Sequence, residues 1–132
     1  MEELTEKRVW QRVRGETDPT EPVRAMLADQ GALLGTYRTL SRRGGAWRRL
    51  WEQKEEQVAC LRGMLRIGTG QGAARPRCGT AGDLNACFTL ERKFLSELTE
   101  LSREGEWGPV FAALLDRQKC QCRTLLMLLG TG

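Results

Sequence analysis

Six polar side chains occupy positions where the surrounding apolar pattern predicts burial inside helices. Each of four expected helices carries apolar residues at helical spacing, and polar residues interrupt each stripe near its middle. The first and third helices contribute one such residue each, and the second and fourth contribute a pair spaced i, i+3. The six residues are Gln30, Lys54, Gln57, Glu91, Gln118 and Gln121.

This one, two, one, two arrangement is the geometry of a helix bundle that binds two metal ions. In such bundles two helices supply one Glu each, and the other two supply a Glu-x-x-His pair. Here Glu91 is the one carboxylate among the six residues, and the chain has no histidine. Two iron ions need several anionic oxygens as well as imidazoles. We therefore predict no bound metal, no cofactor and no catalytic residue at these positions.

A hydrogen-bonded polar cluster in the core is the interpretation that we favour for these side chains. Buried polar groups are nearly always paired, and glutamine offers both a donor and an acceptor. The glutamines around a Lys54–Glu91 pair can therefore close a network. A small-ligand or anion site built on Lys54 is the alternative that the residue types leave open.

Glycine, proline and capping residues place the helices that must position these side chains. Pro22 suits a helix start, where its missing N–H costs nothing, and Asp83 is a good N-cap. The signals predict helices over 22–43, 46–67, 84–104 and 109–129. A weak apolar pattern over 3–14 predicts a short leading helix within an N-terminal extension, residues 1–19.

The connections predict how the helices are arranged. The turns at Gly44-Gly45 and at 105–108 are tight, so each flanking pair should form an antiparallel hairpin. The glycine-rich segment 68–82 is expected to be a loop, and at about 3.3 Å per residue it can span ~50 Å. A 20-residue helix is only ~30 Å long, so this loop can cross the whole bundle. One domain over 1–132 with an all-α, ferritin-like four-helix fold follows.

The order and spacing of these motifs resemble the rubrerythrin-like branch of the ferritin-like superfamily, in particular its short forms without a rubredoxin domain. The resemblance covers most of residues 22–129, and its motifs are LADQGALLGTYRTL, AWRRLWEQKEEQVACLRGM and GPVFAALLDRQKCQCRTLLMLLG. It implies that Gln30 stands at a metal-binding Glu position, and that Glu91 keeps the family's residue type. The two Glu-x-x-His pairs would fall on Lys54 with Gln57 and on Gln118 with Gln121. The chain then resembles a degenerate member that has lost its di-iron site.

Such a loss favours a non-catalytic binding or scaffolding protein, which we expect to be a homodimer. Trp10 and Trp107 lie outside the apolar stripes, and tryptophan is enriched at interface hot spots. One competing hypothesis is a di-metal oxidoreductase or iron-handling protein with unorthodox ligands. Another is a binder of acidic partners or nucleic acid through the arginines of the first turn. Neighbouring glutamates favour a solvated mixed surface there, so nucleic acid is not expected; these arginines are Arg38, Arg42, Arg43, Arg48 and Arg49.

Composition and cysteine usage indicate a reducing compartment. The net charge is +4, the first seven residues lack the apolar core of a secretory leader, and no apolar run is long enough for a membrane span. The five cysteines follow no disulfide framework, so we expect a cytoplasmic protein without a membrane partner. Cys78, in the predicted loop, is the candidate reactive thiol. Cys120 and Cys122 should point in nearly opposite directions, whereas Cys60, Cys87 and Cys122 look like small core residues.

Overall fold

A computed structural model describes residues 20–69, 81–103 and 105–131 of the chain. This described part holds four α-helices and a short 3-10 helix, Ser41–Arg43, and no β-strand. The α-helices are α2 (Thr20–Leu40), α3 (Gly45–Thr69), α4 (Leu84–Leu101) and α5 (Gly108–Thr131). The all-α prediction is confirmed for this part of the chain. The predicted leading helix over 3–14, Trp10 and Cys78 lie outside the described residues.

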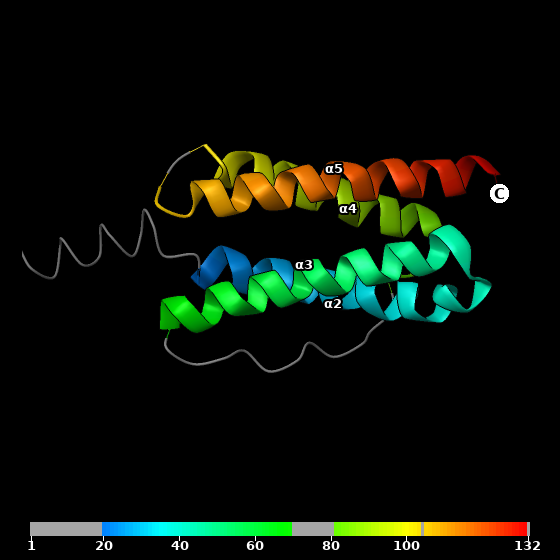
Figure 1. Ribbon diagram of the computed structural model, residues 1–132, viewed down its shortest axis with the longest axis horizontal. Coiled ribbons are helices and arrows are strands. Elements are labelled where there is room, and N and C mark those ends of the chain that lie inside the picture. The colour runs from blue at the N-terminus through cyan, green and yellow to red at the C-terminus, as the bar shows by residue number, and fades with distance from the viewer. Residues whose placement is uncertain (1–19, 70–80, 104, 132) are drawn as a thin grey trace, which may run out of the picture.

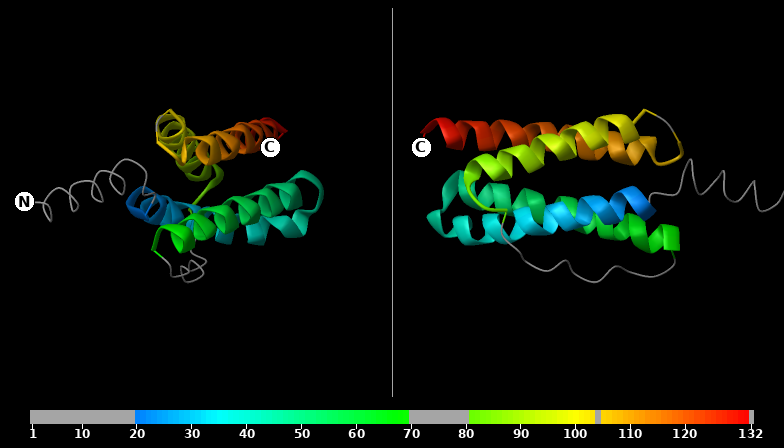
Figure 2. Two further views of the ribbon diagram at one scale, coloured as in Figure 1. Left: turned by 60° about the vertical axis from the view of Figure 1, so that its left-hand side comes forward. Right: turned by 180° about the vertical axis from the view of Figure 1, so that it is seen from behind.

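The helices pack lengthwise as two antiparallel pairs (Figure 1). α2 packs against α3, and α4 packs against α5, while further contacts join α3 to α5 and α2 to α4. The last turn of α3 and the first turn of α4 lie at opposite ends of the molecule, as the view from behind also shows (Figure 2). The chain between these two helices therefore connects opposite ends. No described helix is both long and apolar enough to cross a membrane.

Glycine and a capping aspartate set the turns that position the helices. Gly44 has a φ of 73° and ends the 3-10 helix, in a conformation that a side chain rarely adopts. The Asp83 side chain accepts a hydrogen bond of 2.8 Å from the backbone N–H of Ala86 and caps α4 as predicted. A Cβ on Gly108 would lie 3.2 Å from the Ser102 carbonyl oxygen, a close contact that favours glycine in this tight turn.

Several predicted helix boundaries were wrong by a few residues. α2 begins at Thr20, before Pro22. The first four N–H groups of a helix have no partner within the helix, so the missing N–H of Pro22 costs no helical hydrogen bond. α3 continues into the predicted loop 68–82 and ends at Thr69, since a glycine near a helix end costs only about 1 kcal/mol. α5 likewise runs past Gly130 to Thr131, and α4 ends at Leu101 instead of near residue 104.

The apolar stripes form two core clusters with polar residues between them along the helices. One cluster contains Phe94, Leu98 and Phe111, and the other contains Tyr37, Leu50 and Leu125. Trp107 is half-buried and packs against the first cluster. The sequence placed Trp107 outside the core, whereas the structure packs it against a core cluster. That packing weakens the basis on which Trp107 was expected to anchor a partner.

Candidate functional site

The structure brings the predicted polar residues into the interior at one level of the four helices. α2 supplies Gln30, α3 supplies Lys54 and Gln57, and α4 supplies Glu91. α5 supplies the remaining two glutamines. All six side chains are completely buried, with 0 % of their surface exposed: Gln30, Lys54, Gln57, Glu91, Gln118 and Gln121. We call this set the central polar cluster.

The Lys54 ammonium is at the centre of the hydrogen bonding. Its Nζ donates to Gln30 Oε1 at 2.5 Å, to Gln57 Oε1 at 2.6 Å and to Glu91 Oε1 at 2.7 Å. An ammonium has three N–H donors and no acceptor, so three acceptors match the charged form of the side chain. Nζ also lies 5.0 Å from the centre of the Phe94 ring, in the range of a cation–π contact.

The orientation of the surrounding amides follows from this one cation. Because Gln57 turns its oxygen to Lys54, its Nε2 faces away and donates to Gln118 Oε1 at 3.0 Å. Gln118 Nε2 in turn donates to Glu91 Oε1 at 3.0 Å and to the Glu91 carbonyl at 2.8 Å. Lys54, Gln57, Gln118 and Glu91 therefore form a closed ring in which the donors begin at the ammonium and end at the carboxylate.

Tyr37 belongs to this network although it was not among the six polar residues predicted from the sequence. Its hydroxyl donates to Glu91 Oε2 at 3.0 Å, so both carboxylate oxygens are engaged. Burial and the nearby Glu91 charge raise the pKa of Tyr37 well above its usual value. The signal in the sequence was spacing, because Tyr37 follows Gln30 by seven residues, or two helical turns.

Gln121 and the amide nitrogen of Gln30 are less well satisfied. Gln121 Nε2 donates at 3.1 Å to the carbonyl of Leu50 in α3, which is not one of the four residues of the ring. Gln121 Oε1 and Gln30 Nε2 are buried without a hydrogen-bond partner in the described structure. The sequence therefore placed all six residues in one layer, but it did not distinguish the ring from these two peripheral glutamines.

Burial shifts the titration of the central groups. It lowers the pKa of Lys54 below its usual value, and the nearby Glu91 charge opposes this shift. It also raises the pKa of the Cys87 and Cys122 thiols to about 11. Cys122 Sγ is 3.6 Å from Gln118 Nε2, so this thiol borders the ring. Burial thus keeps the Cys87 and Cys122 thiols protonated and unreactive at neutral pH.

Cys60, Cys120 and the arginines of the first turn lie at or near the surface. Cys120 is exposed while Cys122 is buried, which agrees with their predicted opposite directions, and Cys60 is only partly buried. Arg48 pairs with Glu52 at 3.1 Å, and Arg43 stacks over Trp47 at 5.1 Å. The arginines of the first turn are thus mixed with acidic and aromatic residues. All five of them are exposed: Arg38, Arg42, Arg43, Arg48 and Arg49.

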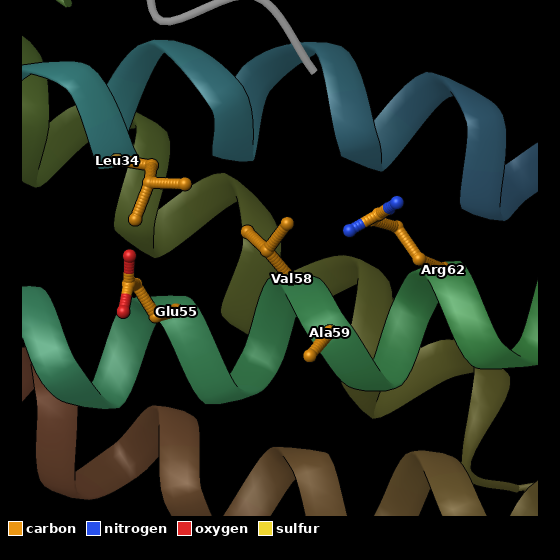
Figure 3. A pocket seen from close by; sticks show the side chains of 5 residues that line it. All are labelled: Leu34, Glu55, Val58, Ala59 and Arg62. Atoms are coloured by element: carbon orange, nitrogen blue, oxygen red, sulfur yellow. The ribbon is translucent and has the colours of Figure 1, made fainter. Parts of the chain in front are cut away.

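Two surface pockets are separate from the central polar cluster. One, of about 250 Å³, is lined by Gln53, Glu56, Arg117 and Cys120. The other, of about 180 Å³, has Leu34, Val58 and Ala59 on its apolar side (Figure 3). Glu55 and Arg62 of α3 line its two ends. Neither pocket is lined by a residue of the cluster.

The residues of the cluster do not fit the di-iron centre found in the family that the chain resembles. Within the described ranges, no three or more His, Cys, Asp and Glu side chains come together at a site that could hold a metal ion. Glu91 already accepts bonds from Lys54, Gln118 and Tyr37. A metal ion there would face the positive charge of Lys54 at short range, and amides are weak substitutes for carboxylates and imidazoles.

Comparison with family models, with curated proteins and with solved structures finds no match.

Proposed function

We propose that this chain is a degenerate, rubrerythrin-like member of the ferritin-like superfamily and that it acts as a non-catalytic binding or scaffolding protein. In this proposal a hydrogen-bonded network replaces the di-iron centre of a four-helix bundle. The single observation that carries it is the Lys54 ammonium, which lies between Gln30, Gln57 and Glu91 at 2.5–2.7 Å.

The arrangement of the helices supports the fold assignment. Two antiparallel pairs whose connection joins opposite ends are typical of a bundle with one long crossover, as in ferritin-like folds. The six buried polar residues also stand at the one, two, one, two positions from which such bundles bind metal. The connection of the helices and the positions of the six residues both agree with the motifs that carry the resemblance.

The chemistry of the cluster supports a structural role. A general acid or base must reach a substrate proton directly or through one water. The charged pair of the central polar cluster, Lys54 and Glu91, is completely buried, and its polar atoms are engaged within the network. The network connects all four helices, because the ring joins α3, α4 and α5, and Gln30 and Tyr37 of α2 bond to Lys54 and Glu91.

Metal analysis tests this proposal directly. We expect the chain, purified from cells supplied with iron and manganese, to contain far less than one metal ion per chain. A reconstructed variant should recover binding; it carries Gln30→Glu, Lys54→Glu, Gln57→His, Gln118→Glu and Gln121→His. It should bind about two ions per chain, as carboxylate-bridged bundles do.

The matched control adds Glu91→Gln to the reconstructed variant and should lose most of this binding. Circular dichroism shows in each case whether the helices have formed. Two results would contradict the proposal. The first is about two ions per native chain that disappear with Glu91→Ala. The second is a folded reconstructed variant that binds no metal.

A further inference from the structure

The central polar cluster places an amine, a carboxamide and a carboxylate within reach of one another. Lys54 Nζ lies 2.5 Å from Gln30 Oε1. A carbonyl bond is about 1.23 Å long, so Gln30 Cδ can lie at most about 3.7 Å from Nζ. Reacting atoms in near-attack conformers are about 3–3.5 Å apart. The distance between Nζ and Cδ therefore exceeds the near-attack range by at most about 0.2 Å.

We propose that the folded chain joins the Lys54 side chain to the Gln30 side chain through an amide bond, with release of ammonia. This bond would link α3 to α2 covalently across the core. It would be a self-modification that happens once per chain, and it goes beyond the proposed binding or scaffolding role. The hydrogen-bonded arrangement described above is the state that precedes it.

The geometry favours Gln30 over the other glutamine that contacts Lys54. Gln57 Oε1 is at a similar distance of 2.6 Å, but its Nε2 donates to Gln118 Oε1 at 3.0 Å. Gln30 Nε2 is completely buried and has no hydrogen-bond partner in the described structure. Nothing therefore holds the nitrogen of Gln30 that must leave, whereas the nitrogen of Gln57 is held in the ring.

Glu91 accepts the proton that the Lys54 ammonium must lose before its nitrogen can attack. Its Oε1 lies 2.7 Å from Lys54 Nζ and accepts a proton from the ammonium, which leaves a neutral amine. The amine then forms a bond to Gln30 Cδ, and within this tetrahedral adduct a proton moves from Nζ to Nε2, which turns Nε2 into a leaving amine. The Cδ–Nε2 bond then breaks and ammonia leaves. An amine and a carboxamide become a secondary amide and ammonia, so no oxidant or reductant is needed.

The surroundings favour this reaction over hydrolysis. Lys54, Gln30 and Glu91 are completely buried, and the Phe94 ring lies 5.0 Å from Nζ. A lysine amine without hydration is a stronger nucleophile than one in water. Burial also lowers the pKa of Lys54, which makes the neutral amine more accessible. Groups held in place by the fold react with effective concentrations that no bimolecular reaction reaches.

Intact-mass spectrometry of the folded full-length chain tests the proposal. We expect incubation at neutral to mildly alkaline pH to lower the mass by one ammonia until the whole population has reacted. Tryptic digestion should then yield one linked product that joins residues 25–38, which contain Gln30, to residues 50–62, where cleavage after Lys54 is blocked.

Two glutamine variants make the matched comparison. Gln30→Leu should keep its full mass indefinitely, whereas Gln57→Leu should still lose ammonia, because it removes only the alternative carboxamide. A native chain that stays at full mass after prolonged incubation would overturn the proposal, and so would a linked product that contains Gln57 in place of Gln30. Either result leaves the proposed function intact, because metal analysis does not depend on the cross-link.

Discussion

Two lysine–carboxylate pairs join different helices at almost the same distance but lie in opposite environments. Lys54 Nζ is 2.7 Å from Glu91 Oε1, with both side chains completely buried. Lys93 Nζ is 2.8 Å from Asp29 Oδ2, with 59 % and 27 % of the two side chains exposed. The hydrogen bond to Asp29 raises the pKa of Lys93, whereas burial lowers the pKa of Lys54 although its carboxylate is closer.

This difference shows that the environment of an ion pair, more than its N–O distance, decides what the pair does. Water solvates Lys93 and Asp29 whether or not they touch, so each can lose the other at little cost. Lys54 and Glu91 have given up their hydration, so each depends on the other and on the amides around them. The central polar cluster is therefore expected to be far more sensitive to substitution than the surface.

The largest expected effect is that of removing one buried charge. Lys54→Met leaves Glu91 in the core without a counter-ion, which should lower the free energy of unfolding by about 3–5 kcal/mol. Lys93→Met is the matched control, since it removes the same kind of side chain from a pair of similar length and should be close to silent. Urea unfolding followed by circular dichroism measures both. Equal losses from the two variants would remove the distinction between the two pairs.

A second, smaller contrast lies within the central polar cluster itself. Gln118→Leu removes the acceptor of Gln57 and a donor to Glu91, and leaving such groups unpaired should cost about 1–3 kcal/mol. Gln121→Leu removes one bond to the Leu50 carbonyl and an oxygen that already lacks a partner, so its cost should be lower. Both changes are glutamine to leucine on α5. The same unfolding experiment decides the order, and a larger loss for Gln121→Leu would show that the ring is not what stabilises the centre.

The sequence predicted which residues make up the central polar cluster. Helical spacing placed Gln30, Lys54 and Glu91 on the apolar stripes, and burial of all three follows from those stripes alone. The spacing of the pairs on α3 and α5 likewise put two side chains of each helix on one face. The N-cap at Asp83 was evident because capping depends on neighbouring residues in the chain.

The direction of the network could not be read from the sequence. It depends on whether each amide presents its oxygen or its nitrogen to a given neighbour, and the Lys54 ammonium decides this only once the helices are packed. Tyr37 was missed as a donor to Glu91 because an aromatic residue in a stripe is indistinguishable from ordinary core. Helix ends such as Thr69 were misplaced because a glycine close to the end of a helix is only weakly unfavourable.

The smallest expected effect compares a buried thiol with an exposed one at alkaline pH. The folded chain holds Cys122 protonated up to a pKa of about 11, while an unfolded chain releases this proton near the usual value of 9.0. The unfolded state then binds fewer protons, so the free energy of unfolding should fall as the pH rises from about 9 to about 11. The other groups that titrate in this range contribute equally to all variants and cancel in a comparison.

Cys122→Ala should therefore make this alkaline fall shallower, whereas Cys120→Ala should leave it unchanged because Cys120 is exposed. The quantity compared is the slope of the free energy of unfolding against pH, which does not depend on packing lost at neutral pH. Parallel slopes for the native chain and Cys122→Ala would show that the thiol is not held protonated by burial.

A double-mutant cycle of Lys54→Met and Glu91→Leu tests the central claim most directly. It should be measured by urea unfolding on freshly refolded protein of full mass, so that no cross-linked chain contributes. Each single variant should lose about 3–5 kcal/mol, while the double variant should recover most of that loss, because apolar residues of similar volume replace both charges. A strong coupling of this kind would identify a buried, mutually dependent pair. Small and additive effects, like those expected of Lys93 and Asp29, would contradict the account.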